Sequence, residues 1–346
     1  MSDKISKVTI LDIARELNIT AATVSRALND HPGIKETTKK AVREMATRLN
    51  YKHNRIASSL RLGKSNIVGV IIPSAEINFF GSVVHGIEKV ASENNYTVLI
   101  YQSNELYEDE KKGVQTFLQS RVDGVLASIS KETINLDHYS EIRNRGIPLV
   151  LFDRTDDKLG VSSVVVDDFA GAYQATSHLI INGCHRIAHI AGQQHVNIFN
   201  LRLKGYIEAL NVHNIPVNED LIVHGKVSIE SGRECMKQLL MRGVSPDAVF
   251  AVEDFTALGA IQTIKAAGLK IPEDIAIIGF ANEAFGEYLT PSLSTVNQQT
   301  VTMGEEAARL IFEGLRSGES FHAHPRKLVL KPQIICRQSS VKYPGR

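Results

Sequence analysis

The sequence of 346 residues has no tryptophan, only three cysteines and only 6% aromatic residues. Cys184, Cys235 and Cys336 are far apart, and none has a second cysteine or histidines at metal-ligand spacing, so we expect three free thiols in a reducing compartment. No apolar run is long enough to cross a membrane, and the opening residues MSDKISKV lack the apolar centre of a signal peptide. These absences predict a cytoplasmic protein that does not enter a membrane.

Motifs of the common enzyme classes are also missing. There is no G-x-S-x-G, no Walker phosphate loop and no G-x-G-x-x-G after an expected strand. His185, His189 and His195 are scattered over a helix end, a strand and a loop, where histidines are more often structural than ligands. We therefore predict a protein that is not an enzyme and that needs no metal or cofactor.

Charge is unevenly distributed along a chain whose net charge is only +1. Residues 1–64 contain 13 Lys and Arg against 6 Asp and Glu, whereas the remaining residues contain 26 against 32. A basic first segment on an acidic body is typical of a chain that meets a polyanion through that segment.

The stretch TILDIARELNITAATVSRALN, residues 9–29, predicts two short helices with a tight break between them. Apolar residues recur at helical spacing on both sides of Asn18-Ile19-Thr20, and Thr20 suits the N-cap of the second helix. The outer face of that helix carries small or hydrogen-bonding residues and one long cation, Arg26, which suits the major groove of DNA. Taken alone, this stretch fits an ordinary helical hairpin equally well.

The next segment predicts a third helix and a connector. Residues 35–50 have an apolar stripe, with Lys39, Lys40, Arg43 and Arg48 expected to face water or phosphate. Residues 55–66, RIASSLRLGKSN, are weakly helical with little to bury, and so short a helix is marginal in water without another surface. We assign residues 1–50 to a helix-turn-helix unit, called the headpiece below, and residues 51–66 to a weak helix and linker, called the hinge segment below.

From Ile67 onward, short apolar strands alternate with amphipathic helices, which predicts parallel sheets with right-handed crossovers. The expected fold class is a small all-α headpiece followed by an α/β core of two doubly wound lobes. The first lobe is expected to comprise residues 67–160 plus about 292–325, and the second residues 161–291 plus about 326–346.

Two lobes with several crossovers should form a cleft at the carboxyl ends of their strands. Asp153 and Arg154 follow one expected strand, and Asp167 and Asp168 follow the next. These carboxylates could be catalytic, but helix N-caps and hydrogen-bonding groups of a binding cleft are favoured.

Several longer segments carry a family resemblance. They are VTILDIARELNITAATVSRALN, NYKHNRIASSLRLGKSNIVGVIIP, RVDGVL, GIPLVLFDR, RLKGYIEAL, EDFTALGAIQTIKAAGLKIPEDIAIIGF and TPSLSTVNQQTVTMGEEAARLI. In this order they resemble the lac repressor (LacI/GalR) family of bacterial transcription regulators over essentially the whole chain. The resemblance implies a core of the type I periplasmic-binding-protein kind and a homodimer on near-palindromic double-stranded operator DNA. It also implies a small-molecule effector, a sugar or related metabolite, in the cleft.

By this resemblance, three groups of residues contact DNA. The positions that read base edges are Ala21, Ala22 and Arg26. The positions that contact phosphates are Thr20, Thr23, Ser25, Asn29 and Tyr51. The hinge positions are Asn54, Ala57, Leu60 and Arg61, with Leu60 as the wedge that kinks the duplex in its minor groove.

By the same resemblance, eight positions are expected to contact the effector. They are Phe80, Asp153, Arg154, Arg202, Val227, Asp254, Ala281 and Asn282. Arg202 matches an arginine that bonds ligand oxygens; it could merely brace the cleft, but a cleft arginine without a carboxylate partner favours ligand contact. The chain departs from the family at three positions, with Glu253 in place of a frequent Asn, Ala281 in place of an Asp, and Val227 in place of Phe or Trp. The effector therefore stays unnamed.

The sequence thus predicts a repressor whose operator affinity is set by an effector, because a ligand that favours one lobe arrangement changes whether the paired hinges form. The alternative is a solute-binding protein of the two-lobed periplasmic type, which the missing signal peptide disfavours. An enzyme on the same fold lacks a nucleophile and base that we could place. No leucine heptads follow Arg337, so we expect no tetramerisation helix.

Overall fold

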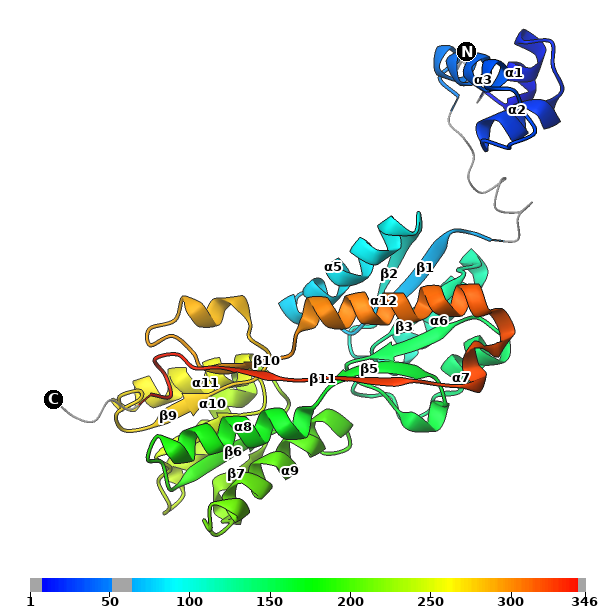
Figure 1. Ribbon diagram of the computed structural model, residues 1–346. Coiled ribbons are helices and arrows are strands. Elements are labelled where there is room, and N and C mark those ends of the chain that lie inside the picture. Colours follow the sequence, from blue (N-terminus) through cyan, green and yellow to red (C-terminus); the bar gives the residue numbers. More distant parts are fainter. Residues whose placement is uncertain (1–7, 52–63, 342–346) are drawn as a thin grey trace, which may run out of the picture. The chain divides into compact units, whose positions relative to one another are not determined.

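The computed structural model describes residues 8–51 and 64–341 (Figure 1). The chain divides into two compact units, residues 1–65 and residues 66–346. This division falls inside the segment expected to be the linker. We describe each unit by itself.

The first unit contains three helices. They are α1 (Ile10–Glu16), α2 (Ala21–Leu28) and α3 (Glu36–Arg48). α1 begins where Asp12 accepts hydrogen bonds from the Thr9 backbone amide, at 2.8 Å, and from the Thr9 hydroxyl, at 2.7 Å. Between α1 and α2, Asn18 adopts a φ of 50°, a conformation that Asn tolerates better than most residues. The expected helix pair and third helix are confirmed.

The helices of this unit share a small apolar core. Its buried members are Ile13, Ala14, Val24, Ala27, Val42 and Ala46. Lys39 differs from expectation: it is 6% exposed and its Nζ lies 2.6 Å from Glu36 Oε1 and 3.8 Å from Asp30 Oδ1. Because it is engaged in these ion pairs, Lys39 is not a water-facing cation of α3.

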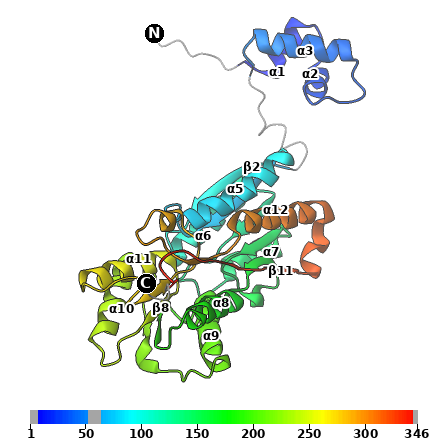
Figure 2. The same cartoon turned by 60° about the vertical axis from the view of Figure 1, so that its left-hand side comes forward.

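The second unit contains two parallel sheets, each covered by helices on both faces (Figures 1 and 2). The larger sheet has the order β11-β5-β4-β3-β1-β2. Its strands are β1 (Ile67–Ile72), β2 (Thr97–Gln102), β3 (Gly124–Ala127), β4 (Leu149–Phe152), β5 (Ser162–Val166) and β11 (Lys327–Leu330). Its helices are α5 (Asn78–Glu93), α6 (Tyr107–Ser120), α7 (Asp137–Asn144) and α12 (Thr300–Ser317).

One apolar core lies on each face of the larger sheet. α5 and α12 bury one face around Val83, Ile87 and Met303, and α6 and α7 bury the other face. α5 and α12 lie side by side (Figure 1) and approach closely at two glycines. A Cβ atom on Gly304 would lie 2.0 Å from the carbonyl oxygen of Val83, so only glycine permits this crossing.

The smaller sheet of the second unit has the order β7-β6-β8-β9. Its strands are β6 (Ile187–Ala191), β7 (Ile222–His224), β8 (Ala248–Ala251) and β9 (Ala276–Ile278). Its helices are α8 (Asp168–Ile181) and α9 (Asn197–Val212) on one face and α10 (Ile229–Met241) and α11 (Asp254–Ala266) on the other. An antiparallel pair, β10 (Thr295–Asn297) and β12 (Gln333–Ile335), lies beside it, and short 3-10 helices span Asp157–Leu159, Glu219–Leu221, Ala284–Glu287 and Gly318–Ala323.

The two-lobed α/β core is as expected, but the lobe boundaries differ. β5, placed in the second lobe from sequence, pairs with β4 in the larger sheet, and β11 then pairs with β5. Conversely, β10 is expected in the first lobe from sequence, but Ser294 directly before it bridges to Ile278 of β9, and Asn297 of β10 bridges to Ala281. Apolar periodicity indicates a strand and not the sheet it joins, so these boundaries could not be read from the pattern.

Candidate functional site

The second helix of the headpiece presents a narrow polar face. The Thr20 hydroxyl caps α2 by accepting a hydrogen bond from the Thr23 backbone amide at 3.2 Å. Ala22 and Arg26 are exposed and lie one helical turn apart, so they share this face. Ala21 is half-buried against the apolar core, which leaves Ala22 and Arg26 as the exposed base-reading candidates.

The phosphate-contact candidates lie around the same helix. Asn29 is exposed, and its side-chain amide donates to the carbonyl of Ser25 at 2.8 Å, which stabilises the end of α2. Thr20 and Thr23 are joined by a hydroxyl hydrogen bond of 2.9 Å. Tyr51 packs partly against the headpiece core. The hinge candidates Asn54, Ala57, Leu60 and Arg61 lie outside the described residues.

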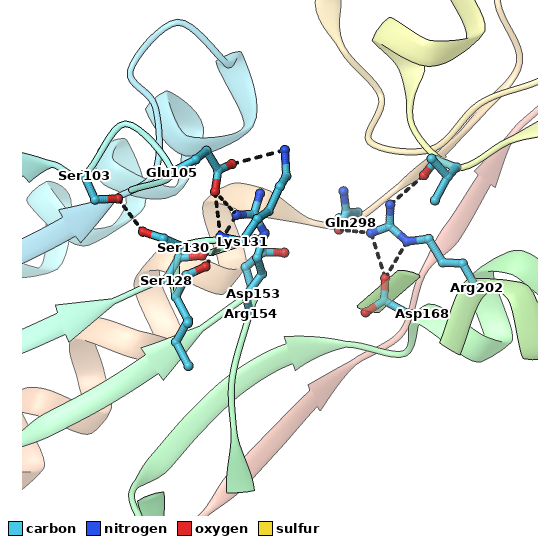
Figure 3. A network of polar contacts seen from close by, with 12 residues as sticks. Ser103, Glu105, Ser128, Ser130, Lys131, Asp153, Arg154, Asp168, Arg202 and Gln298 are labelled. Carbon is cyan, nitrogen blue, oxygen red and sulfur yellow. Dashed lines mark hydrogen bonds and ion pairs between the residues drawn. The ribbon is translucent and has the colours of Figure 1, made fainter. Parts of the chain in front are cut away.

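A cavity of about 340 Å³ lies between the two lobes of the second unit. Six of the expected effector residues line it: Phe80, Asp153, Arg154, Arg202, Val227 and Ala281. Most of its remaining wall is apolar or acidic and comes from both lobes: Glu76, Ile77, Phe79, Lys131, Ile198, Phe199, Ser228, Ile229, Glu230, Glu253, Phe255, Glu283 and Gln298. Figure 3 shows that polar side chains of the two lobes face each other there.

Arg202 anchors the second-lobe side of the cavity and is only 2% exposed. Its Nη2 lies 2.7 Å from Asp168 Oδ1, its Nη1 donates to the carbonyl of Val252 at 2.7 Å, and it also bonds Gln298 (Figure 3). Its guanidinium lies 3.7 Å from the centroid of the Phe280 ring. The sequence argument assumed an arginine without a carboxylate partner, and that premise is wrong because Asp168 comes from the neighbouring helix.

Lys131 and Arg154 share one carboxylate on the first-lobe side. Arg154 Nη1 lies 2.7 Å from Glu105 Oε2, and Lys131 Nζ lies 3.3 Å from Glu105 Oε1 (Figure 3). Burial opposes ionisation, but the two cations hold the pKa of Glu105 below its usual value. Burial and the nearby Arg154 lower the pKa of Lys131. The cations of this wall are therefore already compensated within the protein.

Three residues of the cavity wall adopt positive φ angles. They are Asp153 at 59°, Val227 at 56° and Ala281 at 128°. Such conformations are costly for residues other than glycine and cluster at ligand sites, where the surrounding structure holds them. Burial raises the pKa of Asp153, which accepts a hydrogen bond from the Ser128 hydroxyl at 3.3 Å. The strained backbone agrees with a functional role for this cavity.

Glu253 and Glu283 give the second-lobe wall an acidic character that the sequence did not predict. Glu253 Oε2 accepts a hydrogen bond from the Phe255 amide at 2.9 Å, at the start of α11. Burial, together with Asp254 and Glu283, raises the pKa of Glu253 to about 8. Glu283 is 3% exposed, accepts a hydrogen bond from the Phe79 amide of the first lobe at 3.2 Å, and has a pKa raised by burial.

Asp254 and Asn282 do not line the cavity, which corrects their expected role. Asp254 is fully buried and accepts hydrogen bonds from the Thr295 hydroxyl, at 2.7 Å, and from the Glu283 amide, at 2.8 Å. Asn282 accepts a hydrogen bond from Arg337 at 3.0 Å. Both side chains hold β10 and the last segment against the second lobe, and only the family resemblance places them at the ligand.

The three scattered histidines have structural partners. His189 is stacked between Tyr206 and Phe250, and burial lowers its pKa to about 3. His185 is exposed, and its amide donates to Asp247 at 3.0 Å. His195 Nε2 lies 2.9 Å from the Lys131 carbonyl oxygen, so this contact joins the two lobes. Within the described part of the chain, no group of three or more His, Cys, Asp or Glu residues could hold a metal ion.

Cys184 and Cys235 are buried and Cys336 is exposed, and none of the three forms a disulfide, as expected. In residues 8–51 and 64–341, no helix combines the length and apolar character that a membrane span requires.

Comparison with known proteins identifies both parts of the chain. Residues 9–54 match the family of bacterial regulatory proteins, lacI family, and residues 176–340 match the periplasmic binding protein-like domain. The probable HTH-type transcriptional repressor ExuR of Bacillus subtilis is 36% identical over 295 residues, which cover 84% of this chain and 86% of that protein. The HTH-type transcriptional repressor PurR of Pasteurella multocida is 30% identical over 96% of this chain and 98% of its own length.

Solved structures agree with this assignment. A complex of the transcriptional regulator CelR with cellobiose has a TM-score of 0.72 at 28% identity and covers 96% of this chain and 99% of that one. The lac repressor dimer bound to operator and the anti-inducer ONPF has a TM-score of 0.87 at 23% identity, covering 97% and 100% of the two chains, and supports the fold. The relatives are regulators and not enzymes, and the chain belongs to the lacI family of bacterial regulatory proteins, as a helix-turn-helix transcriptional regulator.

Proposed function

We propose that this regulator is a repressor whose affinity for operator DNA is controlled by a small molecule in the inter-lobe cavity. The observation that carries the proposal is the composition of the cavity wall, to which both lobes contribute, with Arg154 on one side and Arg202 on the other. A ligand that contacts both lobes has a different affinity for each arrangement of the lobes, so it changes the populations of these arrangements. The cellobiose complex of CelR supports a ligand role for such a core.

We further propose that the chain acts as a homodimer in the cytoplasm, with two headpieces on a near-palindromic site. One headpiece buries few residues and presents only Ala22 and Arg26 as exposed candidates for base reading. Two copies at half-site spacing double this limited readout, and proteins of this class place such helices in successive major grooves. Leu60 and the other hinge positions would then add specificity through DNA bending.

A selection experiment tests the proposal. Full-length protein is incubated with a pool of random duplexes, and the bound DNA is sequenced. We expect an enriched inverted repeat with two equivalent half-sites. A single asymmetric site would contradict the proposal that a homodimer binds the operator. So would a selection that enriches no more DNA than the same selection with a protein that lacks residues 1–65. Metabolites from a cell extract are then screened for those that raise the thermal stability of the core. Such a metabolite should change the affinity of the protein for the selected DNA site, and an unchanged affinity would contradict control by a ligand.

A further inference from the structure

When all carboxyl groups are counted as ionised, the charges of the inter-lobe cavity are not balanced, and the imbalance is negative. The lining residues include three cations, and each has a carboxylate partner: Lys131 and Arg154 pair with Glu105, and Arg202 pairs with Asp168. Asp153 adds a further negative group 3.8 Å from Arg154. The arginines and the lysine therefore leave no net positive charge for a ligand.

Three lining carboxyl groups have no such compensation. Within the described residues, Glu76, Glu253 and Glu283 form no ion pair with any lysine, arginine or histidine, whereas Glu230 at the rim lies 3.6 Å from Arg233. Glu253 and Glu283 are the important ones because Glu283 is buried, Glu253 is half-buried, and both carboxyl groups accept hydrogen bonds from backbone amides. A buried carboxyl group without a cation partner is costly when ionised.

The aromatic part of the wall is suited to a ligand that carries a positive charge on a ring. Phe79, Phe80, Phe199 and Phe255 line the cavity together with the two glutamates. Aromatic rings attract cations through the negative potential of their faces, and they also pack against the C–H groups of a ring. The volume of about 340 Å³ is near the lower end of the range for small-molecule sites, which suits a ligand built on one ring.

We propose that the effector of this regulator is a small organic cation, a compact ring or polyol that carries a protonated amine, whose ammonium group binds between Glu253 and Glu283. This inference rests on the proposed function, since it takes the cavity to be the effector site. The amine supplies the positive charge that the cavity lacks, and Lys131 and Arg154 stay with Glu105. A neutral ligand forms no ion pair with either carboxyl group, and an anionic ligand would bring a further negative charge to an acidic wall.

Binding of such a ligand should release a proton from the protein. Burial, Asp254 and Glu283 raise the pKa of Glu253 to about 8, and burial raises the pKa of Glu283, so near neutral pH Glu253 is mostly protonated. Lys131 is the nearby cation on the facing wall. An ammonium group favours the ionised carboxylate, so binding transfers a proton from the protein to the buffer. A neutral sugar of the same shape gives no such release.

Matched pairs of probes test the charge of the ligand. Titration calorimetry and thermal shift on the full-length protein compare D-glucosamine, D-galactosamine and D-mannosamine with the parent hexoses, the uronic acids and calcium chloride. We expect at least one amino sugar to bind at least tenfold more tightly than its parent hexose and its uronic acid. The proposal is overturned when no amino sugar binds, or when a hexose, a uronic acid or calcium binds as tightly.

The variant Glu253→Gln tests whether the Glu253 carboxylate binds the ammonium group. Its amide oxygen can still accept the hydrogen bond from the Phe255 amide, so α11 keeps its cap, and circular dichroism and DNA binding verify the fold. Expected results are a loss of amino-sugar affinity of at least tenfold and a loss of proton release, measured as equal binding enthalpies in phosphate and Tris buffers. Glu234→Gln, on the exposed face of α10, is the matched control and should bind as the parent protein does. Unchanged affinity in Glu253→Gln would refute the assignment.

The two proposals fail in different ways. Enrichment of an inverted repeat without amino-sugar binding refutes only the cationic effector. Amino-sugar binding without selection of any DNA site leaves the cavity assignment intact and refutes the proposed control of operator binding.

Discussion

The guanidinium of Arg202 on α9 is held between the carboxylate of Asp168 on α8, at 2.7 Å, and the ring face of Phe280, at 3.7 Å. Both charged residues are at most 3% exposed. This arrangement fixes one wall of the cavity before any ligand arrives, because the arginine is positioned by protein groups alone. A ligand thus meets a preorganised surface there, which lowers the cost of ordering on binding.

Asp168→Ala is expected to destabilise the core strongly. Removing the carboxylate leaves a buried guanidinium without compensation, which typically costs about 3–5 kcal/mol. The midpoint of urea unfolding measures the effect. Asp167→Ala is the matched control, because Asp167 caps α8 through the Ala170 amide at 2.9 Å and its loss should cost only about 1 kcal/mol. Equal effects of the two substitutions would argue against the buried pair.

Arg26→Ala is expected to weaken binding to the selected operator while sparing most non-specific binding. Arg26 is the one long donor on the exposed face of α2, and a bidentate contact with guanine contributes about 1–3 kcal/mol of discrimination. Fluorescence titrations at one fixed salt concentration compare the operator with a scrambled duplex. Should both affinities fall by the same factor, Arg26 contacts phosphate and does not read bases.

The stability of the core should respond to pH through Glu253. Its pKa in the folded state, about 8, lies above the value of about 4.5 for an exposed glutamate. Between these values the folded state keeps a proton that the unfolded state has released, so stability falls as the pH rises from about 4.5 to 8. Glu253→Gln removes this loss, and its thermal midpoint should exceed that of the parent protein increasingly from pH 5 to pH 8.5.

Glu105→Gln is the contrasting variant for that experiment. Arg154 and Lys131 hold the pKa of Glu105 below its usual value, so its stabilising effect is present above the pKa of the unfolded state and is lost on acidification. At pH 7 this substitution should lower the thermal midpoint. A change of the same sign in both variants would contradict the charge distribution described for the cavity.

The crossing of α5 and α12 predicts opposite effects for two glycine substitutions. Gly304→Ala would place a Cβ atom 2.0 Å from the Val83 carbonyl oxygen, and such overpacking usually costs about 1–3 kcal/mol. Gly81→Ala, on the exposed side of α5, meets no atom within 4 Å and should stabilise the helix by about 0.5–1 kcal/mol. Thermal unfolding of the core measures both. Destabilisation by Gly81→Ala would show that local propensity does not decide at that position.

Local patterns were sufficient to predict most helices and strands. The Thr20 cap, the apolar stripe of α3 and the alternating elements after Ile67 all depend on neighbouring residues, which a sequence displays directly. The sheet that β5 or β11 joins depends instead on partners distant in the chain, and periodicity does not contain that information.

The contacts of the cavity also depend on partners that are distant in the chain. Phe80 and Arg202 could be placed there by resemblance, but the partner of Arg202 is Asp168, 34 positions away and on another helix. In the sequence, Glu253 stands out only as a departure from the family pattern, and no pattern marks Glu283. Their meaning depends on which cations are already paired, and that is a property of the folded arrangement. The departure at Glu253 was the one signal in the sequence that could have indicated an acidic wall.

The positions of α12 and β11 also constrain synthesis of the chain on the ribosome. Met303 and Ile311 of α12 complete the core over one face of the larger sheet, and β11 covers the open edge of β5. Until these late residues leave the exit tunnel, the nascent first lobe has an uncovered apolar face and an unpaired strand edge. The second lobe from α8 to β9 is one continuous segment, but β10, β12 and Ser339 join it only later in synthesis. The first lobe therefore stays incomplete over the longest stretch of synthesis, from β1 to β11, and it is the one that most needs protection from aggregation.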